Sequence, residues 1–262
     1  MWFHRAFWLG LVRGITEFLP ISSTGHARLF QEILSEEAYR VSFLYGFTSL
    51  AILLANLIFF RRELKGIFKK KKTILNVLIS GLPVALLIVF LQKSIASSEL
   101  LSGFWIIAAA FAVTGVILIK FNKLPSMKKV KSYEDLKITD ALCIGIVNLF
   151  ALVPGFSRFG LSFISTKIVG LDTKNSLKYS YLASIPSLVV ISIASFTNPN
   201  ALNFLSTDFG QCSLAFGMAF IAALYVLALT KMYFAKKNDT KVLGWYLIFA
   251  TLTICVFELL KQ

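Results

Sequence analysis

The sequence predicts an all-α polytopic membrane protein with six transmembrane helices and two opposed re-entrant helix hairpins. The composition supports this fold class: 57% of the 262 residues are hydrophobic, and mean hydropathy is +0.75. Only 15% of the residues are charged, whereas a soluble domain carries roughly 25%. Six apolar segments are long enough to cross a bilayer, and shorter ones carry polar residues. Residues 1–262 are therefore expected to form a single integral-membrane domain.

A helix needs about 20 apolar residues to cross the hydrocarbon core of a bilayer. Six segments reach that length, namely residues 41–60, 73–92, 100–119, 179–197, 212–230 and 242–260. The segment 7–21 is shorter and contains Arg13 and Glu17. The segments 141–153 and 160–169 are also too short, and they flank the stretch "PGFSR". We expect each of these two regions to enter the membrane and return to the same side.

Loop charge sets the expected orientation, because cytoplasmic loops carry an excess of Lys and Arg. The basic loops are residues 61–72, 120–137 with six lysines, and 231–241 with four. The loop 93–99 has one lysine and the loop 198–211 has none. The six spans alternate correctly only if the segment 140–171 enters from the cytoplasmic side and returns to it. Residues 1–38 then start and end on the outer side. The excess of 27 Lys and Arg over 13 Asp and Glu is thus interpreted as a topology signal, not a nucleic-acid surface.

The two halves of the chain resemble each other. "VSFLYGFTSL" at 41 matches "YSYLASIPSL" at 179 in Ser, aromatic, Leu, Ser and Leu, and "GLVRGITEFLP" at 10 resembles "GIVNLFALVP" at 145 with one residue deleted. The first repeat is 1–120, with its hairpin at 1–38, and the second is 139–262, with its hairpin at 139–171. Each half has three spans, and because three is odd, the second half is inserted in the opposite orientation to the first. Many transporters are built from such inverted repeats, with a binding site at the midplane of the membrane. Both Pro-containing loops should therefore line one polar pocket.

The polar residues of the two hairpins suit a phosphate ester. Arg158 can bind phosphate oxygens with its planar fork. Backbone amides near Gly25 and Gly155 favour anions where helices start. The further candidate phosphate ligands are Thr24, Ser157 and Ser162.

A hydroxyl beside a histidine can form a nucleophile–base pair, which Ser23 and His26 provide. Glu17 can orient the base or hold a metal ion. The candidate catalytic residues are thus Glu17, Ser23, His26 and Arg158, with Glu17 also the candidate metal ligand. A serine, a histidine or an activated water as nucleophile all fit this set.

"TEFLPISSTGH", followed about 130 residues later by "PGFSRFG", resembles the undecaprenyl-diphosphatase family, also called the bacitracin-resistance protein family. The resemblance covers essentially the whole chain, including "GLDTKNSLKYSYLASIP" after the second motif. It implies six spans with two opposed re-entrant hairpins. It also implies removal of the terminal phosphate of undecaprenyl diphosphate, which regenerates the lipid carrier for peptidoglycan and other surface polymers.

The chain departs from the family pattern at several positions. The family usually has an acid or an amide four residues before the Glu of its first motif, and this chain has Arg13 there. The family's second motif is usually PGxSRSxxT. This chain has Phe159 in place of the second Ser of that motif and Ser162 in place of the Thr, and it has Asn148 where the family usually has a Gln before the motif. The family's acids are thought to help hold a divalent cation such as Mg²⁺ or Ca²⁺. An arginine adds positive charge where that cation would lie.

Two interpretations of Arg13 stay open. In the first, Arg13 replaces the cation and clamps the diphosphate together with Arg158, because guanidinium and Mg²⁺ both stabilise a transferring phosphoryl group. In the second, catalysis is weakened, and the protein transports or flips a polyprenyl phosphate. The expected partners are a polyprenyl diphosphate and the membrane, with a homodimer as one option and no nucleic acid. The expected location is the bacterial inner membrane, with the active site facing the outer side.

Overall fold

The computed structural model describes residues 2–33, 38–67, 70–97, 103–121, 132–197, 201–236 and 239–260. Every element within these residues is a helix, which confirms the all-α class. The elements are α1 (Trp2–Glu17), α2 (Ser23–Ile33), α3 (Ala38–Phe59), α4 (Arg61–Ile67), α5 (Lys71–Ser97), α7 (Phe104–Phe121), η1 (Tyr133–Asp135), α8 (Ile138–Asn148), η2 (Leu149–Leu152), α9 (Arg158–Ile168), α10 (Thr173–Phe196), α11 (Ala201–Thr207), α12 (Phe209–Lys236) and α13 (Lys241–Leu260).

Four described helices are long and apolar enough to cross a membrane, namely α5, α10, α12 and α13. A fifth candidate span is α3 with α4, which are bent by 77° at their junction. The helix α7, which covers most of the expected span 100–119, is apolar but shorter, as is the segment 138–152. The described residues therefore contain four to five candidate spans plus shorter apolar helices. The loop segments 34–37, 98–102, 122–131 and 198–200, on which part of the orientation prediction depends, lie outside the described residues.

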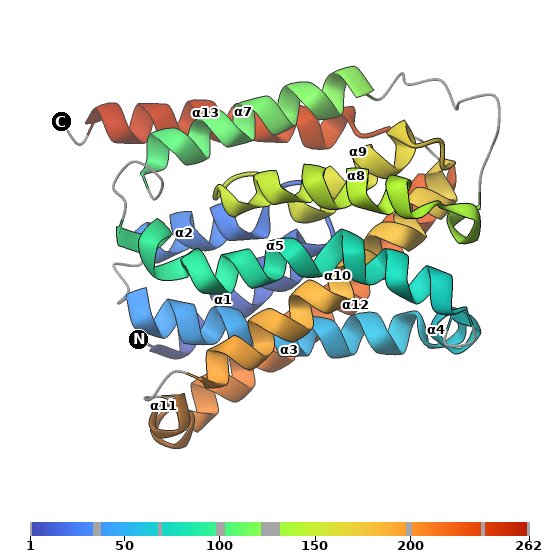
Figure 1. The fold of residues 1–262 in the computed structure, drawn as a ribbon. Helices are drawn as coiled ribbons and strands as arrows, with labels where there is room; N and C mark the ends of the chain where they lie inside the picture. The colour runs from blue at the N-terminus through green and yellow to red at the C-terminus, as the bar shows by residue number, and fades with distance from the viewer. Residues whose placement is uncertain are drawn as a thin grey trace.

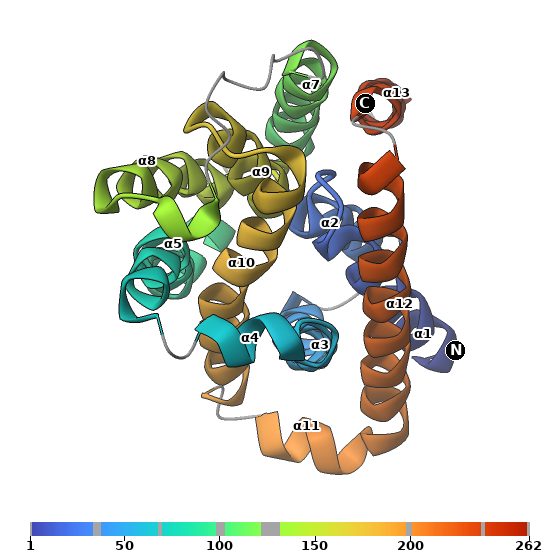
Figure 2. The same ribbon diagram turned by 90° about the vertical axis from the view of Figure 1, so that its right-hand side faces the viewer.

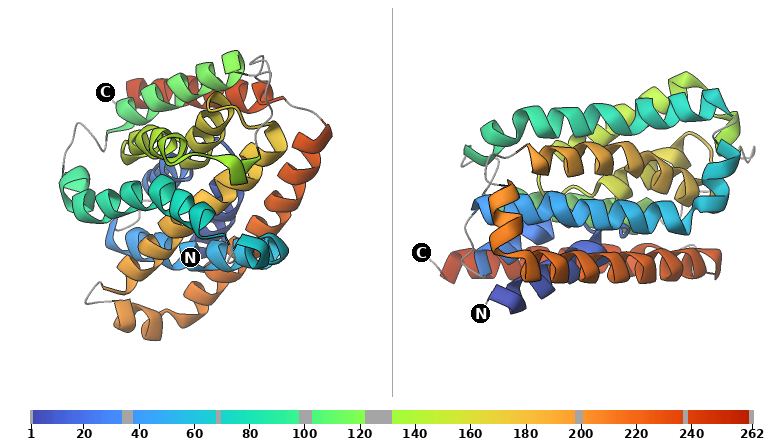
Figure 3. Two further views of the ribbon diagram at one scale, coloured as in Figure 1. Left: turned by 45° about the vertical axis from the view of Figure 1, so that its right-hand side comes forward. Right: turned by 90° about the horizontal axis from the view of Figure 1, so that it is seen from below.

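The long helices run side by side, with both termini and α11 at one end and α4 at the other (Figure 1). The helices α3, α5, α10 and α12 pack together, and α1 lies along α12. The helices α7 and α13 pair along one edge of the molecule, as the end-on view and the left panel of Figure 3 show (Figures 2 and 3). A Cβ on Gly115 of α7 would lie 2.8 Å from the Gly244 carbonyl oxygen of α13. Small residues thus let these backbones approach closely, as is common between membrane helices.

The apolar core surrounds the two hairpins. Phe18 is fully buried and packs edge-on against Tyr181 of α10, with ring centroids 5.6 Å apart. Phe159 stacks on the other side of Tyr181 at 5.0 Å. Phe159 stands where the related family usually has a serine, and here its ring fills core space between α9 and α10. Outward-facing residues of α13 are large and apolar, including Phe249 at 69% exposure, as expected of a helix facing lipid.

Candidate active site

The loops of the two hairpins touch each other. The first loop, residues 18–22, joins α1 to α2, and the second loop, residues 153–157, joins η2 to α9. Ser157 Oγ donates a hydrogen bond to the Leu19 carbonyl at 3.3 Å. A Cβ on Gly160 would lie 3.0 Å from the Pro20 ring. The two segments, about 130 residues apart in sequence, therefore form one site, as the sequence predicts.

Each hairpin begins its second helix with the same Ser-x-x-Gly cap. Ser22 Oγ accepts from the Gly25 amide at 3.2 Å, and Ser157 Oγ accepts from the Gly160 amide at 3.0 Å. A serine hydroxyl in this position satisfies an otherwise unpaired amide of the first helical turn. The first helical residues are then Ser23 and Arg158. Both side chains stand at the positive end of a helix dipole, which favours an anion.

Glycine at 155 is required by packing. Gly155 has φ +109°, a region that other residues rarely adopt, and lies in the second loop, not at a helix start. A Cβ there would lie 2.7 Å from Ala110 and 2.9 Å from the Ile107 carbonyl, both on α7. Gly25 is close by: a Cβ on it would lie 3.1 Å from Gly155 Cα. The structure thus gives both glycines a packing role, and amide binding of phosphate at them stays a prediction.

A three-residue charge cluster occupies the centre of the site. Glu17 Oε2 accepts from Arg13 Nη1 at 2.7 Å, and Glu17 Oε1 accepts from Arg158 Nη2 at 2.8 Å. The Arg13 side chain is fully buried, and the Glu17 and Arg158 side chains are 4% and 12% exposed. Two guanidiniums and one carboxylate leave one net positive charge. Such a charge in a buried site favours an incoming phosphate.

Arg13 is held by residues of three elements. Besides Glu17, its Nη1 donates to Ser23 Oγ, and its Nη2 donates to Ser49 Oγ at 2.8 Å. Its guanidinium carbon lies 3.7 Å from the ring centroid of Tyr45. The Ser23 hydroxyl is also within hydrogen-bonding reach of Glu17. These contacts fix the nucleophile candidate Ser23 against a carboxylate and a guanidinium at once.

Tyr45 and Ser49 of α3 belong to the site but are absent from the sequence-based set. A usable signal exists in the repeat "VSFLYGFTSL"/"YSYLASIPSL", where Ser49 pairs with Ser187. Both serines lie at the site, since Ser49 contacts Arg13 and Ser187 lines the cavity described below. Tyr45 carries no such signal, because its position is alanine in the second copy.

Three buried hydrogen-bond donors at the cluster have no partner: Arg13 Nε, Tyr45 OH and Arg158 Nη1. Tyr45 also lies beside Arg158, though without a well-formed hydrogen bond between them. Leaving buried donors unpaired costs free energy. A phosphate group, which has several acceptor oxygens, is a ligand that can pair with donors of this kind.

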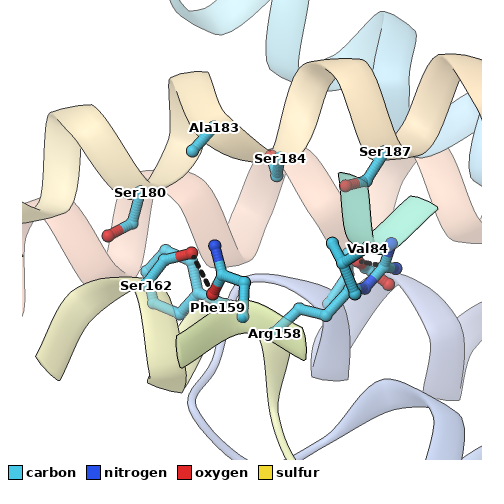
Figure 4. Close-up of a pocket in the computed structure, with 10 residues that line it drawn as sticks. Val84, Arg158, Phe159, Ser162, Ser180, Ala183, Ser184 and Ser187 are labelled. Carbon is cyan, nitrogen blue, oxygen red and sulfur yellow. Dashed lines mark hydrogen bonds and ion pairs between the residues drawn. The ribbon is translucent and has the colours of Figure 1, made fainter. Parts of the chain in front are cut away.

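A small cavity adjoins Arg158 between α9, α10 and α5 (Figure 4). Ser180, Ser184 and Ser187 of α10 line it, opposite Ser162 of α9. Ser162 Oγ donates to Asn148 Oδ1 at 3.0 Å, while Asn148 Nδ2 donates to the Ser80 carbonyl at 3.0 Å. The space is only about 10 Å³, roughly one water-sized sphere. A diphosphate therefore requires this region to open.

His26 and Thr24 point to other partners. His26 Nδ1 lies 2.7 Å from the Ser22 carbonyl, and its Nε2 lies 2.7 Å from the Tyr246 hydroxyl. Since a carbonyl only accepts, Nδ1 carries a proton, and in the neutral ring Nε2 accepts from Tyr246. Thr24 Oγ1 lies 3.2 Å from Ser22 Oγ. The structure brings Arg13, Glu17, Ser23 and Arg158 together and places His26 against α13.

The residues present do not fit a divalent cation. Both oxygens of Glu17 already face guanidinium nitrogens. The described residues contain no group of three or more His, Cys, Asp or Glu that could hold a metal ion. Mg²⁺ and Ca²⁺ need several oxygen ligands, and Arg13 would repel either cation. The donor set is that of an anion site.

Residues 6–253 match a protein family described as "Bacitracin resistance protein BacA". A protein from Thermosipho africanus described as undecaprenyl-diphosphatase is 34% identical over 248 residues, covering 92% of this chain and 94% of its own. "Undecaprenyl-diphosphatase 1" from Clostridioides difficile is 30% identical over 270 residues, or 97% and 95% of the two chains. An undecaprenyl-diphosphatase from Methanococcus maripaludis is 31% identical over 259 residues, or 95% and 98%.

Proposed function

Because this chain belongs to the bacitracin resistance protein BacA family, a family of multi-pass membrane proteins, we propose that it hydrolyses undecaprenyl diphosphate to undecaprenyl phosphate and phosphate. Relatives at 30–34% identity over more than 90% of the chain carry the name undecaprenyl-diphosphatase. The observation that carries the proposal is the buried, unpaired Nη1 of Arg158 beside an ion-paired Glu17. This arrangement binds a phosphate group and leaves a hydroxyl and a carboxylate next to it.

Arg158 is the proposed phosphate clamp. Its Nη1 has no partner, and its Nη2 is shared with Glu17. A terminal phosphate entering from the adjoining cavity would accept from both nitrogens in a two-point contact. Glu17 would then lose one of its two guanidinium partners. A carboxylate with fewer cationic neighbours is a stronger base, so substrate binding itself would prepare Glu17 to accept a proton.

Ser23 is the proposed nucleophile and Glu17 its general base. The Ser23 Oγ would attack the terminal phosphorus, its proton passing to Glu17, while the bridging P–O bond breaks and undecaprenyl phosphate leaves. Glu17 would give that proton to the departing undecaprenyl phosphate. In the second step water would attack the phosphoserine, its proton passing through Glu17 to Ser23 Oγ as the Oγ–P bond breaks and phosphate leaves. Such two-step transfer divides one difficult displacement into two. Ser157, through its hydrogen bond to the Leu19 carbonyl, keeps the second loop against the first.

Arg13 is the proposed substitute for the metal ion that the family's acids are thought to hold. Its guanidinium supplies a fixed positive charge beside Glu17 and Ser23, at the place where charge develops on the transferring phosphoryl group. Preorganised cations of this kind stabilise the transition state electrostatically. The activity of this chain would therefore be independent of Mg²⁺ and Ca²⁺.

The finer membrane placement belongs to the same proposal. In this proposal the chain has six spans, with α7 as the shortest, and forms an inverted repeat of 1–120 and 139–262. The first hairpin is then open to the outer side of a bacterial inner membrane. The matching caps Ser22–Gly25 and Ser157–Gly160 support two equivalent hairpins. Substrate would then reach the site from the outer leaflet.

Phosphate release from undecaprenyl diphosphate by the purified protein in detergent tests the function. We expect release that is lost in Arg158→Ala. If the unaltered protein releases no phosphate, with or without Mg²⁺ or Ca²⁺, the proposed hydrolysis is refuted. Transport of a polyprenyl phosphate would then be the function to test. Turnover that survives in Arg158→Ala would refute the clamp.

The role of Arg13 is tested by metal binding, independently of turnover. Arg13→Glu places a second carboxylate beside Glu17, and we expect it to bind Mn²⁺ in titration calorimetry, whereas the unaltered protein does not. Arg13→Gln is the matched control, since it removes the guanidinium without adding a carboxylate. Equal Mn²⁺ binding by the unaltered protein and Arg13→Glu would contradict the substitution of a cation by Arg13.

A further inference from the structure

A second, larger cavity lies away from the charge cluster, between α2, α7 and α13. Its volume is about 320 Å³, at the lower end of the range of roughly 300–1,000 Å³ that small-molecule sites occupy. We call it the lateral groove and define it by His26, Leu29, Phe104, Phe249, Ile254 and Phe257. No residue of the proposed mechanism lines it, although His26 is one of the catalytic candidates from the sequence.

The lateral groove is built for an apolar ligand that comes from the membrane. Aromatic and aliphatic side chains from all three helices make up most of its lining, and the polar residues that line it are His26, Glu32, Tyr246 and Thr253. Phe249 and Phe257 are 69% and 43% exposed, so the side formed by α13 is open where that helix faces lipid. Apolar pockets with few polar groups bind apolar molecules through excluded water and close packing.

The groove and the active site share the helix α2. His26 lines the groove, and its imidazole stacks on Phe111 of α7 at 5.0 Å and on Tyr246 of α13 at 5.8 Å. The hydrogen bond from the Tyr246 hydroxyl to His26 Nε2 joins α13 to α2 at the same point. Ser23, the proposed nucleophile, lies one helical turn before His26. A molecule with its phosphate at Arg158 could therefore lay its adjacent apolar part in the groove.

The position of the groove in the membrane also suits the substrate. The groove uses α2 from His26 onward, the first residue of α7, and α13 from Tyr246 to Phe257. The helix α2, the start of α7 and the C-terminal end of α13 lie at the end of the molecule that holds both termini (Figure 1). Residues 93–99, which include the end of α5, contain one lysine, as expected of the outer side.

We propose that the lateral groove binds the first isoprenoid units of the substrate's polyprenyl chain, with the rest of the chain in the bilayer. This inference rests on the proposed diphosphatase function, because it takes that substrate as the occupant. It gives His26 and Tyr246 a positioning role: both line the groove and orient the chain toward Ser23. A phospholipid acyl chain and a second copy of the protein are the other conceivable occupants.

Photocrosslinking tests occupancy directly. The probe is a polyprenyl phosphate carrying a diazirine on its second isoprenoid unit, and it is mixed with the full-length protein in phospholipid micelles. We expect labelled peptides from α13 around Phe249 and Ile254, with labelling suppressed by excess undecaprenyl phosphate. Labelling elsewhere, or suppression by excess phospholipid alone, would overturn the assignment. A dimer contact at this face would leave α13 unlabelled and would overturn it too.

Steady-state kinetics provide a second test of the groove assignment. Ala250 lines the groove, whereas Leu252 of the same helix is 60% exposed and lies off it. We expect Ala250→Trp to raise KM for undecaprenyl diphosphate about tenfold, the effect of overfilling a packed apolar site, with kcat retained. Leu252→Trp, the matched control, should leave both constants unchanged. Unchanged kinetics in Ala250→Trp, or an equal change in both variants, would refute the inference.

The two failures are distinguishable. If the unaltered protein releases no phosphate but the probe labels α13, the proposed hydrolysis fails while the groove assignment holds. If turnover is normal but the probe misses α13 and Ala250→Trp behaves as the unaltered protein, the groove assignment fails alone.

Discussion

Replacing Glu17 should damage the protein more than replacing either arginine. Glu17 accepts from two buried guanidiniums, one at each oxygen. Glu17→Gln keeps one acceptor and turns the other into a donor that faces an arginine. It also leaves two buried cations without a counter-charge. Removing one partner of a buried ion pair costs about 3–5 kcal/mol, which lowers the unfolding midpoint of a protein of this size by about 10 °C or more.

Arg158→Gln should reduce turnover strongly but stability only moderately. Arg13 and Glu17 then remain as a neutral pair, while the shorter glutamine loses the hydrogen bond to Glu17 Oε1. We expect a stability loss of about 1.5–3 kcal/mol, the value of one hydrogen bond to a charged group. Turnover should nevertheless fall by about 10²–10³, because a donor to the transferring phosphoryl group is lost.

Thermal unfolding followed by tryptophan fluorescence, with phosphate release in the same detergent, compares the two variants. Glu63→Gln is the control, because Glu63 forms a partly exposed pair with Lys178 at 3.7 Å, and such pairs contribute about 0–1 kcal/mol. The reasoning from charge compensation would be refuted if Glu17→Gln unfolded at the same midpoint temperature as Glu63→Gln while Arg158→Gln unfolded at a lower one.

Three further outcomes are expected. Tyr45→Phe should lower kcat/KM about tenfold without lowering the unfolding midpoint, because it removes an unpaired buried hydroxyl and keeps the ring beneath Arg13; an unchanged kcat/KM would remove Tyr45 from the site. Gly155→Ala should destabilise by about 1–3 kcal/mol, since the added Cβ collides with α7 at φ +109°, and a stable, active variant would contradict that packing. Single cysteines in place of Ser35 and Ser126, which lie outside the described residues, should react with an impermeant maleimide from opposite sides of the membrane; labelling from one side would contradict the orientation.

The sequence could predict the meeting of the two hairpins, because its signals are local. A short apolar segment that contains Glu17 cannot cross a bilayer, and a proline or glycine marks each loop. The basic loops then predict that both segments return to the side they entered. The structure joins these loops directly through Ser157 and the Leu19 carbonyl.

Side-chain partners between distant helices could not be predicted in the same way. His26 follows a hydroxyl-rich stretch, which suggested catalysis, yet its ring bonds to Tyr246, 220 residues later. Tyr45 contacts Arg13 from α3, a helix whose sequence predicts only a membrane span and no site residue. The 77° bend after α3 depends on how α4 packs. Tertiary contacts decide all three, and no local pattern reports them.

The central claim is that this chain hydrolyses undecaprenyl diphosphate with an arginine where relatives are thought to use a metal ion. The most direct measurement is the initial rate of phosphate release by the unaltered protein, first in excess EDTA and then after Mg²⁺ or Ca²⁺ is added back. We predict release in EDTA at a rate that added cation does not raise. Release that is absent in EDTA and restored by the cation would contradict the claim.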